Sequence, residues 1–270
     1  MTVIVDTATG VPAERLRPYV SRYTGYRYAG LPPGVHIGLP GPSLTMVISL
    51  ADPTLVAADR SRQPVGHSAL VGGMHTRPVF IPHEGEQYGV QLQLTPDGAR
   101  SLLGLPAAAL AGTVAGLDDL LGPAAARELP DRLAAASGWA GRFAVLDEVL
   151  WRCAGRLDPP EPVLAGIWGR VLDSGGTVRV ADLAREFGWS RRYLTGRFTA
   201  EFGLGPKDLA RVVRFERSRL LLRGSGWATI AEVASRCGYY DQAHLAREWR
   251  DLAGVAPTGW LAGDDLAAVS

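Results

Sequence analysis

The segment from Val178 to Pro206 reads VRVADLAREFGWSRRYLTGRFTAEFGLGP, and the segment from Thr229 to Pro257 reads TIAEVASRCGYYDQAHLAREWRDLAGVAP. The second segment repeats the first at a separation of 50 residues, which becomes 51 after one additional residue enters the second copy. Six positions match in the two copies: Ala184 and Ala234, Gly188 and Gly238, Leu194 and Leu245, Phe198 and Trp249, Gly203 and Gly254, and Pro206 and Pro257. The repeat predicts two copies of one helical unit.

The matching positions suit a short helix, a tight turn and a second helix. A small alanine lets the two helices cross closely, and a glycine with positive φ ends the first helix. Ser190 and Asp241 stand where the second helix of each copy begins, and both residue types are strong N-caps. Leu194 and Phe198 form an i,i+4 pair, as do Leu245 and Trp249 in the second copy. Each pair predicts one buried stripe along the second helix of its unit. Together these features predict a tandem helix-turn-helix, and a helical hairpin without a ligand is the alternative for either copy alone.

The run IAEVASRCGYYDQAHLAREWRDLAGVAP resembles the second-unit signature of the AraC/XylS family of transcription regulators. The resemblance extends over roughly residues 162–262, and it implies an all-α carboxyl-terminal domain in which one long helix joins two helix-turn-helix units. The joining segment is Pro206–Arg223, where proline suits the first helical position and the apolar residues have helical spacing. About 18 residues at ~1.5 Å each predict a rod of ~27 Å, near the ~34 Å between successive major-groove faces of DNA.

The residues that would contact DNA follow from helix geometry. With the i,i+4 pairs buried, a rotation of about 100° per residue places other side chains on the outward face. The predicted DNA-binding residues are Arg191, Arg192, Thr195 and Thr199 in the first unit, and Gln242, Ala243, Ala246, Arg247 and Arg250 in the second. Arginine can form two parallel hydrogen bonds with guanine, and glutamine can do so with adenine. For each arginine, a phosphate contact or a solvated face is the alternative interpretation.

The first unit departs from the family pattern at Gly196, where relatives often have arginine and where the second unit has Arg247. Glycine offers no side chain to a base, and it weakens a helix by roughly 0.5–1 kcal/mol relative to alanine. We therefore expect base reading by the first unit to depend on Arg192 and Thr195, with a contribution from Arg191.

Charge separates the two parts of the chain. Residues 176–260 contain 14 Lys plus Arg and 9 Asp plus Glu, although the whole chain has a net charge of only +1. Such a local basic excess suits specific binding of double-stranded DNA with salt-dependent phosphate contacts. The two cysteines lack the spacing of a zinc site or redox pair, and no apolar run reaches the ~18–20 residues that span a bilayer. Because a signal-peptide pattern is also absent, we predict a cytoplasmic protein without a membrane partner.

The residues before the repeat predict a different domain. We expect an α+β regulatory domain over residues 1–157 and the DNA-binding domain over residues 158–270, with the sequence DPPEP at 158–162 as the linker. Residues 30–42, GLPPGVHIGLPGP, are typical of a loop because they are rich in proline and glycine. The expected strands are Leu44–Leu50, Ser68–Val71, Val79–Ile81 and Tyr88–Leu94, and the expected helices are Pro96–Leu103, Ala124–Ala136 and Gly141–Ala154. Strands followed by helices favour an α+β fold.

Four tyrosines between Pro18 and Gly30 allow two interpretations: Tyr19, Tyr23, Tyr26 and Tyr28. We favour an amino-terminal helix that packs onto the sheet, and the alternative is a pocket for a small organic ligand. The resemblance implies an effector-binding or dimerisation domain here, because many relatives carry one. The apolar helices between Ala124 and Ala154 are a candidate dimer contact.

Motifs for enzymatic chemistry are absent from the sequence. His67, His75 and His83 recur every eight residues, but the chain has no HxH, HExxH or CxxC pattern that would bring metal ligands together. Glu84 and Glu86 beside His83 leave a metal site as the minor alternative. There is also no nucleophile elbow, phosphate-binding loop or dinucleotide fingerprint. We therefore predict no metal, no cofactor and no enzymatic activity.

The sequence predicts a sequence-specific DNA-binding transcription regulator that inserts two recognition helices into successive major-groove faces and is modulated through its amino-terminal domain. The expected partners are double-stranded DNA, RNA polymerase if the protein is an activator, a small-molecule effector and a second copy of the chain. The alternative is a small-molecule binding module or an enzyme whose helical repeat serves protein contacts. The basic outward faces of the repeat favour the first interpretation, since a protein-binding hairpin does not need them.

Overall fold

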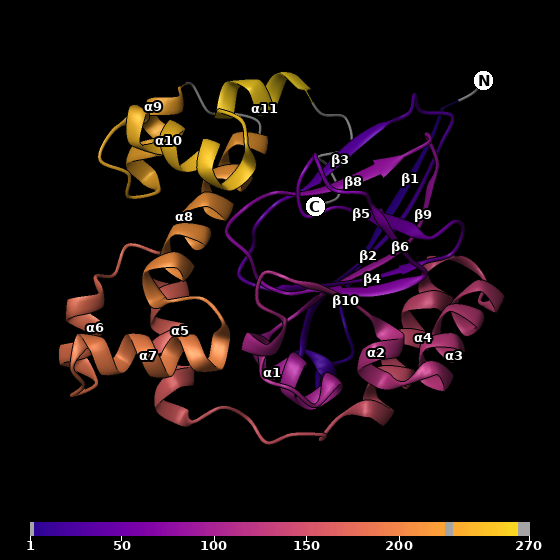
Figure 1. The fold of residues 1–270 in the computed structure, drawn as a ribbon, viewed down its shortest axis with the longest axis horizontal. Helices are drawn as coiled ribbons and strands as arrows, with labels where there is room; N and C mark the ends of the chain where they lie inside the picture. Colours follow the sequence, from indigo (N-terminus) through magenta and orange to yellow (C-terminus); the bar gives the residue numbers. More distant parts are fainter. Residues whose placement is uncertain (1–2, 225–228, 264–270) are drawn as a thin grey trace.

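The structure is a computed structural model, and it describes residues 3–224 and 229–263. The amino-terminal half is built around one antiparallel six-stranded sheet (Figure 1). Its strands, in spatial order, are β1 (Ile4–Gly10), β2 (Val20–Ala29), β9 (Gln87–Leu94), β4 (Leu44–Ser49), β7 (Ala69–Gly72) and β10 (Val114–Gly116). Strands from distant parts of the chain are therefore neighbours, as β2 and β9 are over eight paired positions.

Two short antiparallel ribbons form a second β layer over one face of this sheet (Figure 1). One ribbon pairs β3 (Gly34–Gly38) with β8 (Val79–His83), and the other pairs β5 (Thr54–Val56) with β6 (Val65–His67). A backbone bridge between Ala57 and Phe80 joins the two ribbons. The two β layers thus enclose the interior of a barrel.

Side-chain alternation decides which face of the large sheet is covered by helices. In β4, Leu44, Met46 and Ile48 are fully buried, whereas the intervening Thr45 and Val47 are half-buried and face the second β layer. The buried face packs on short helical segments below the sheet in Figure 1. These segments are η1 (Glu14–Leu16), α1 (Pro96–Gly98), η2 (Ala99–Leu103), η3 (Ala107–Leu110), α2 (Leu117–Leu121), α3 (Pro123–Ala135) and α4 (Gly138–Cys153).

The expected α+β fold of this half is confirmed, but two local expectations were wrong. The segment 30–42 is not a loop throughout, because β3 forms within it and pairs with β8. The tyrosine-rich segment forms β2 rather than a helix, and β2 lies between β1 and β9 in the large sheet. The strands expected around residues 44, 68, 79 and 88 and the helices expected around residues 96, 124 and 141 are present with small shifts in their ends.

In the described part of the carboxyl-terminal half, all regular secondary structure is helical. It contains α5 (Pro162–Asp173), α6 (Val180–Glu186), α7 (Arg191–Phe202), α8 (Pro206–Arg223), α9 (Ile230–Arg236), α10 (Gln242–Ala253) and α11 (Pro257–Gly263). We call α6 and α7 unit 1, and α9 and α10 unit 2. In Figure 1, α8 runs between the two units as a single rod. Among the described residues, no helix is long and apolar enough to cross a membrane.

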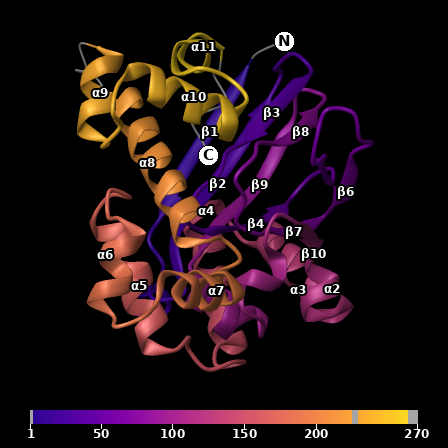
Figure 2. The same ribbon diagram turned by 60° about the vertical axis from the view of Figure 1, so that its left-hand side comes forward.

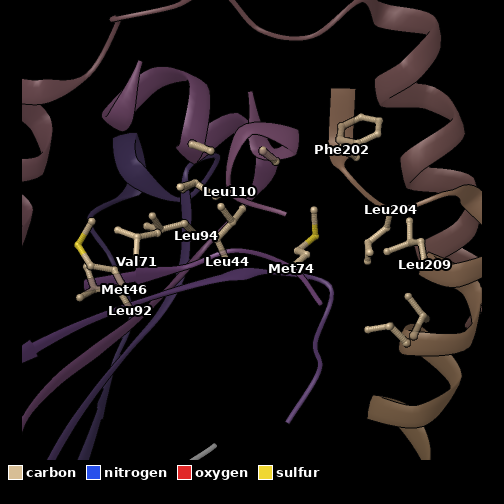
Figure 3. Close-up of a cluster of buried hydrophobic side chains, with 14 of the residues drawn as sticks. Leu44, Met46, Val71, Met74, Leu92, Leu94, Leu110, Phe202, Leu204 and Leu209 are labelled. Carbon is tan, nitrogen blue, oxygen red and sulfur yellow. The ribbon is translucent and has the colours of Figure 1, made fainter. Parts of the chain in front are cut away.

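The two halves share a continuous apolar core. Phe202 at the end of α7 and Leu204 after it lie beside Leu110 and Met74 of the amino-terminal half (Figure 3). An ion pair reinforces this contact, because Arg100 Nη1 lies 2.7 Å from Glu201 Oε1 and both side chains are 16% exposed. Unit 1 therefore rests directly on the amino-terminal half.

Candidate nucleic-acid interface

The two turns are nearly identical in backbone geometry. Gly188 has φ of 70° and Gly238 has φ of 76°, the left-handed region that glycine adopts without a Cβ penalty. In each turn the residue after the glycine donates its backbone N–H to the matching alanine carbonyl. The two donor–acceptor distances are both 2.9 Å, from Trp189 to Ala184 and from Tyr239 to Ala234. The sequence expectation for the turns is confirmed.

The predicted N-caps are also confirmed. Ser190 Oγ accepts the backbone N–H of Tyr193 at 3.2 Å, and Asp241 Oδ1 accepts that of His244 at 2.6 Å. Both bonds satisfy a backbone donor that the first turn of a helix leaves free. The second helix of each unit therefore begins at a defined residue, which fixes the direction of the side chains that follow.

Each of these second helices buries the predicted stripe. Leu194, Phe198, Leu245 and Trp249 have no exposed surface. In unit 2 the buried indole also donates a hydrogen bond, from Trp249 Nε1 to Ser218 Oγ on α8 at 2.8 Å. The buried stripes fix which side of α7 and of α10 faces outward.

The predicted DNA-contacting residues lie on those outward sides. Eight of the nine are exposed and one is half-buried: Arg191, Arg192, Thr195, Thr199, Gln242, Ala243, Arg247 and Arg250 are exposed, and Ala246 is half-buried. None of the four guanidinium groups among them forms an ion pair or side-chain hydrogen bond with another described residue. These arginines are therefore free to meet a ligand, and their contact with DNA stays a prediction.

The one other arginine of these two helices is already engaged. Arg197 on α7 forms a 2.7 Å ion pair with Glu161 and lies over the ring of Tyr193. Gly196, its neighbour, has no heavy atom within 4 Å of the position that a Cβ would occupy. Unit 1 thus has an open place where unit 2 carries Arg247.

Sequence reasoning missed a charged junction behind α10. Glu248, which lies between the outward and buried faces, is only 8% exposed and contacts Arg211 and Arg214 of α8. A signal was present in the sequence: a glutamate next to Trp249 and three residues after Leu245 lies at the edge of the buried stripe, where its charge needs partners.

A large cavity lies between the two β layers of the amino-terminal half. It has a volume of about 510 Å³ and is lined by residues of both layers and of α8. Its lining includes Tyr26 and Tyr28 from β2, Gln91 and Gln93 from β9, and Glu216 and Arg219 from α8. Figure 2 shows α8 alongside the strands. Two of the four tyrosines singled out in the sequence therefore line a pocket, whereas Tyr23 points away and donates to Asp147 of α4 at 2.9 Å.

The cavity wall combines polar groups with low exposure. Burial raises the pKa of Tyr28 to about 12, and its hydroxyl has no hydrogen-bond partner among the described residues. Burial also raises the pKa of Glu216, although the positive charges of Arg219 and Arg22 oppose this shift. Burial lowers the pKa of Arg219. His36, His67 and His75 also line the cavity, but the described residues contain no group of three His, Cys, Asp or Glu that could hold a metal ion.

Two family models match separate parts of the chain. Residues 183–263 match a family model described as a helix-turn-helix domain, a range that covers unit 2 and all of unit 1 except the first residues of α6. The carboxyl-terminal domain is an AraC-type helix-turn-helix domain. Residues 9–115 match a model described as a domain of unknown function, DUF6597. That match covers β2 to β9 in full and includes only parts of β1 and β10.

Relatives of the AraC-type domain include a probable thc operon regulatory protein of Rhodococcus erythropolis, which is 29% identical over 110 residues. The match covers 38% of this chain and 33% of that protein, so the chain matches about a third of the length of this curated relative. Among solved structures, apo ToxT K231A of Vibrio cholerae is similar with a TM-score of 0.55 and 12% identity, over 89% of this chain and 97% of that one. This similarity shows the same two-part fold.

A second solved structure is similar over a smaller share of the chain. The DNA-binding domain of AdpA, crystallised in complex with a target DNA, is 27% identical over 38% of this chain and 92% of that chain, with a TM-score of 0.35.

Proposed function

We propose that the chain is a sequence-specific DNA-binding transcription regulator that inserts α7 and α10 into successive major-groove faces. One observation supports this most directly: on the side opposite their buried stripe, both helices present arginines that have no partner among the described residues. A hairpin that served protein contacts would not need a free guanidinium on each of two equivalent faces. The proposal includes a regulatory role rather than an enzymatic one. It also places the protein in the cytoplasm, where the DNA lies.

The spacing of the two units supports simultaneous binding. The 18 residues of α8 form a rod of about 27 Å, and the two recognition helices lie at its opposite ends (Figure 1). Successive major-groove faces on one side of DNA are about 34 Å apart. The two helices therefore suit half-sites about one helical turn apart, each contributing base contacts from its own outward face.

We further propose that the barrel cavity binds a small organic effector. Its volume is in the range of ligand pockets, and its wall offers hydroxyl and amide groups from Tyr28, Gln91 and Gln93 among apolar residues. Because Glu216 and Arg219 belong to α8, a molecule in the cavity would contact the same helix that joins the two units. A second copy of the chain, and RNA polymerase if the protein activates transcription, are the further proposed partners.

Selection of duplexes from a random DNA pool by the full-length protein tests the main proposal. We expect an enriched sequence motif and an affinity that falls steeply with salt, because phosphate contacts release counterions. The double variant Arg192→Ala and Arg247→Ala removes one free arginine from each unit, and we expect it to lose the motif.

Arg197→Ala is the matched control for this selection. It removes an arginine of α7 that is already engaged with Glu161, so the motif should be retained. Failure of the folded full-length protein to bind any duplex at low salt would overturn the proposal in favour of a protein-contact or enzymatic role.

A further inference from the structure

The side chain of Arg214 connects the two helix-turn-helix units. Arg214 lies on α8, and its Nη1 donates to the backbone carbonyl of Gly176 at 2.7 Å, in the loop that leads into α6 of unit 1. Its Nη2 donates to Glu248 of α10 in unit 2, at 3.0 Å to Oε1 and 3.2 Å to Oε2. The side chains of Arg214 and Glu248 are 16% and 10% exposed. One guanidinium therefore ties the loop that leads into unit 1 to α10 of unit 2.

The loop before α6 also packs against the turn of unit 2 at this place. A Cβ at Gly238, in that turn, would lie 2.6 Å from the side-chain atom Thr177 Cγ2, so a larger residue there would push against the loop. A Cβ at Gly176 would clash with the carbonyl oxygen of Ala210 on α8 and lie 3.0 Å from Arg214 Cγ. Arg214 thus sits at the point of closest approach of the loop before α6, the turn of unit 2 and α8.

The ring of Tyr239 completes the junction. Arg214 lies over this ring with its guanidinium carbon 5.5 Å from the centroid, and Tyr239 directly follows the turn glycine of unit 2. A guanidinium over an aromatic face gains a cation–π attraction in addition to its hydrogen bonds. The planar group is consequently held by contacts in three directions, which restricts rotation of unit 2 relative to unit 1.

We propose that Arg214 is a positioning residue that sets the spacing between the two DNA half-sites. The proposal rests on the proposed DNA-binding function. Helix α8 fixes the axial distance between the units, and Arg214 adds a lateral tie from a backbone atom before α6 to a side chain of α10. With that tie, α7 and α10 keep one relative orientation, and a site of one spacing is bound best. Without it, the units adjust more easily to sites of other spacings.

The neighbouring Arg211 offers a matched control. Its Nε lies 3.1 Å from the same Glu248 carboxylate, and its Nη2 lies 3.3 Å from Asp251. Arg211 has no hydrogen bond to the loop before α6 among those found in the described residues. Arg214→Met therefore breaks the tie to unit 1 while Glu248 keeps a cationic partner. Arg211→Met removes a Glu248 contact of the same kind and leaves the tie intact.

The test measures binding of the full-length protein to the duplex selected by the wild type, and to duplexes with one base pair added or removed between the half-sites. We expect the wild type to prefer the selected spacing by about tenfold, a factor that corresponds to about 1.4 kcal/mol. Arg214→Met should reduce this preference to about threefold or less, because a charge-assisted tie is lost. Arg211→Met should keep the wild-type preference, and both variants should still bind the selected half-sites.

The outcomes separate this proposal from the proposed function. If the wild type binds its selected duplex but tolerates all three spacings equally, the positioning role of Arg214 is overturned and the proposed function stands. The same conclusion follows if a folded Arg214→Met variant keeps the wild-type spacing preference, or if Arg211→Met loses as much of that preference as Arg214→Met does. If Arg214→Met does not fold, Arg214→Lys, which keeps the charge but cannot reach both acceptors, should show an intermediate preference; a wild-type preference there overturns the role. A wild type that selects no DNA overturns both proposals.

Discussion

Unit 1 and unit 2 share a framework but differ in the faces that would meet DNA. Both units have a left-handed glycine turn, a side-chain N-cap and a fully buried i,i+4 pair in the second helix. On the outward side, unit 1 has Gly196 with open space above it, whereas unit 2 has the exposed Arg247. The duplicated residues are thus those that hold the helices together, while the outward-facing residues have diverged.

The units also differ in what supports them. The end of α7 rests on the amino-terminal half through Phe202 and the Arg100–Glu201 ion pair. The charged support of α10 comes instead from α8, through Glu248. The barrel cavity is lined by Glu216 and Arg219 of α8 and by no residue of α6 or α7, so a molecule in it would contact α8 rather than either unit directly.

The largest effect should come from truncating the buried framework. Trp249→Ala should lower the free energy of unfolding of unit 2 by about 3–5 kcal/mol, because it leaves a cavity in a fully buried site. Phe198→Ala is the equivalent change in unit 1 and should cost a similar amount there. Amide hydrogen exchange, read separately in the helices of each unit, would show which unit opens. A loss below about 1 kcal/mol in one unit would break the equivalence of the two frameworks.

Substitution of the turn glycines should destabilise the two units to different extents. Alanine at either glycine must adopt a left-handed conformation, which costs about 1–2 kcal/mol. At Gly188 the added Cβ meets nothing within 4 Å, so Gly188→Ala should cost no more than that. At Gly238 the added Cβ would lie 2.6 Å from Thr177 Cγ2, so Gly238→Ala should cost about 2–4 kcal/mol once the overpacking is included. Thermal unfolding of both variants checks the order, and equal costs would contradict the contact between the units.

The helical repeat was predictable because its signals are local. A turn glycine, an N-cap and an i,i+4 pair lie within one unit, and each acts through contacts along a short stretch of chain. The arginine junction was not predictable, because Gly176, Arg214 and Glu248 are brought together only when the two units fold onto α8. Long-range packing, rather than local preference, decides such contacts.

The amino-terminal half shows the same limit. Alternation in Tyr88–Leu94 revealed a strand, since its apolar residues face the helices and its glutamines face the cavity. The strand β2 was missed because its tyrosines, arginines and serine gave no clear alternation, and β3 was missed because proline and glycine surround it. Both strands are stabilised by pairing with strands more than 40 residues away in the chain.

Base discrimination should change by a smaller amount than stability. Arg247→Ala should lose roughly 1–3 kcal/mol of preference at one base position in the unit 2 half-site, while the protein stays folded. Arg192→Ala should have a comparable effect in the unit 1 half-site, since Arg192 has to compensate for Gly196. Selection from randomised sites measures both preferences. An unchanged preference in the Arg247→Ala variant would make that residue a phosphate contact.

The smallest effect should come from Gly196→Arg, which restores in unit 1 the side chain that unit 2 has. The site is open, so the arginine has room, and replacing a helical glycine should stabilise α7 by roughly 0.5–1 kcal/mol. Unmodified protein should select one sharp and one permissive half-site, about ten base pairs apart. The variant should sharpen the permissive half, or bind more tightly overall if the new arginine meets phosphate. Footprints and selected sequences for both proteins test this. Two equally sharp half-sites for the unmodified protein would contradict the asymmetry, because a glycine cannot supply the missing base contact.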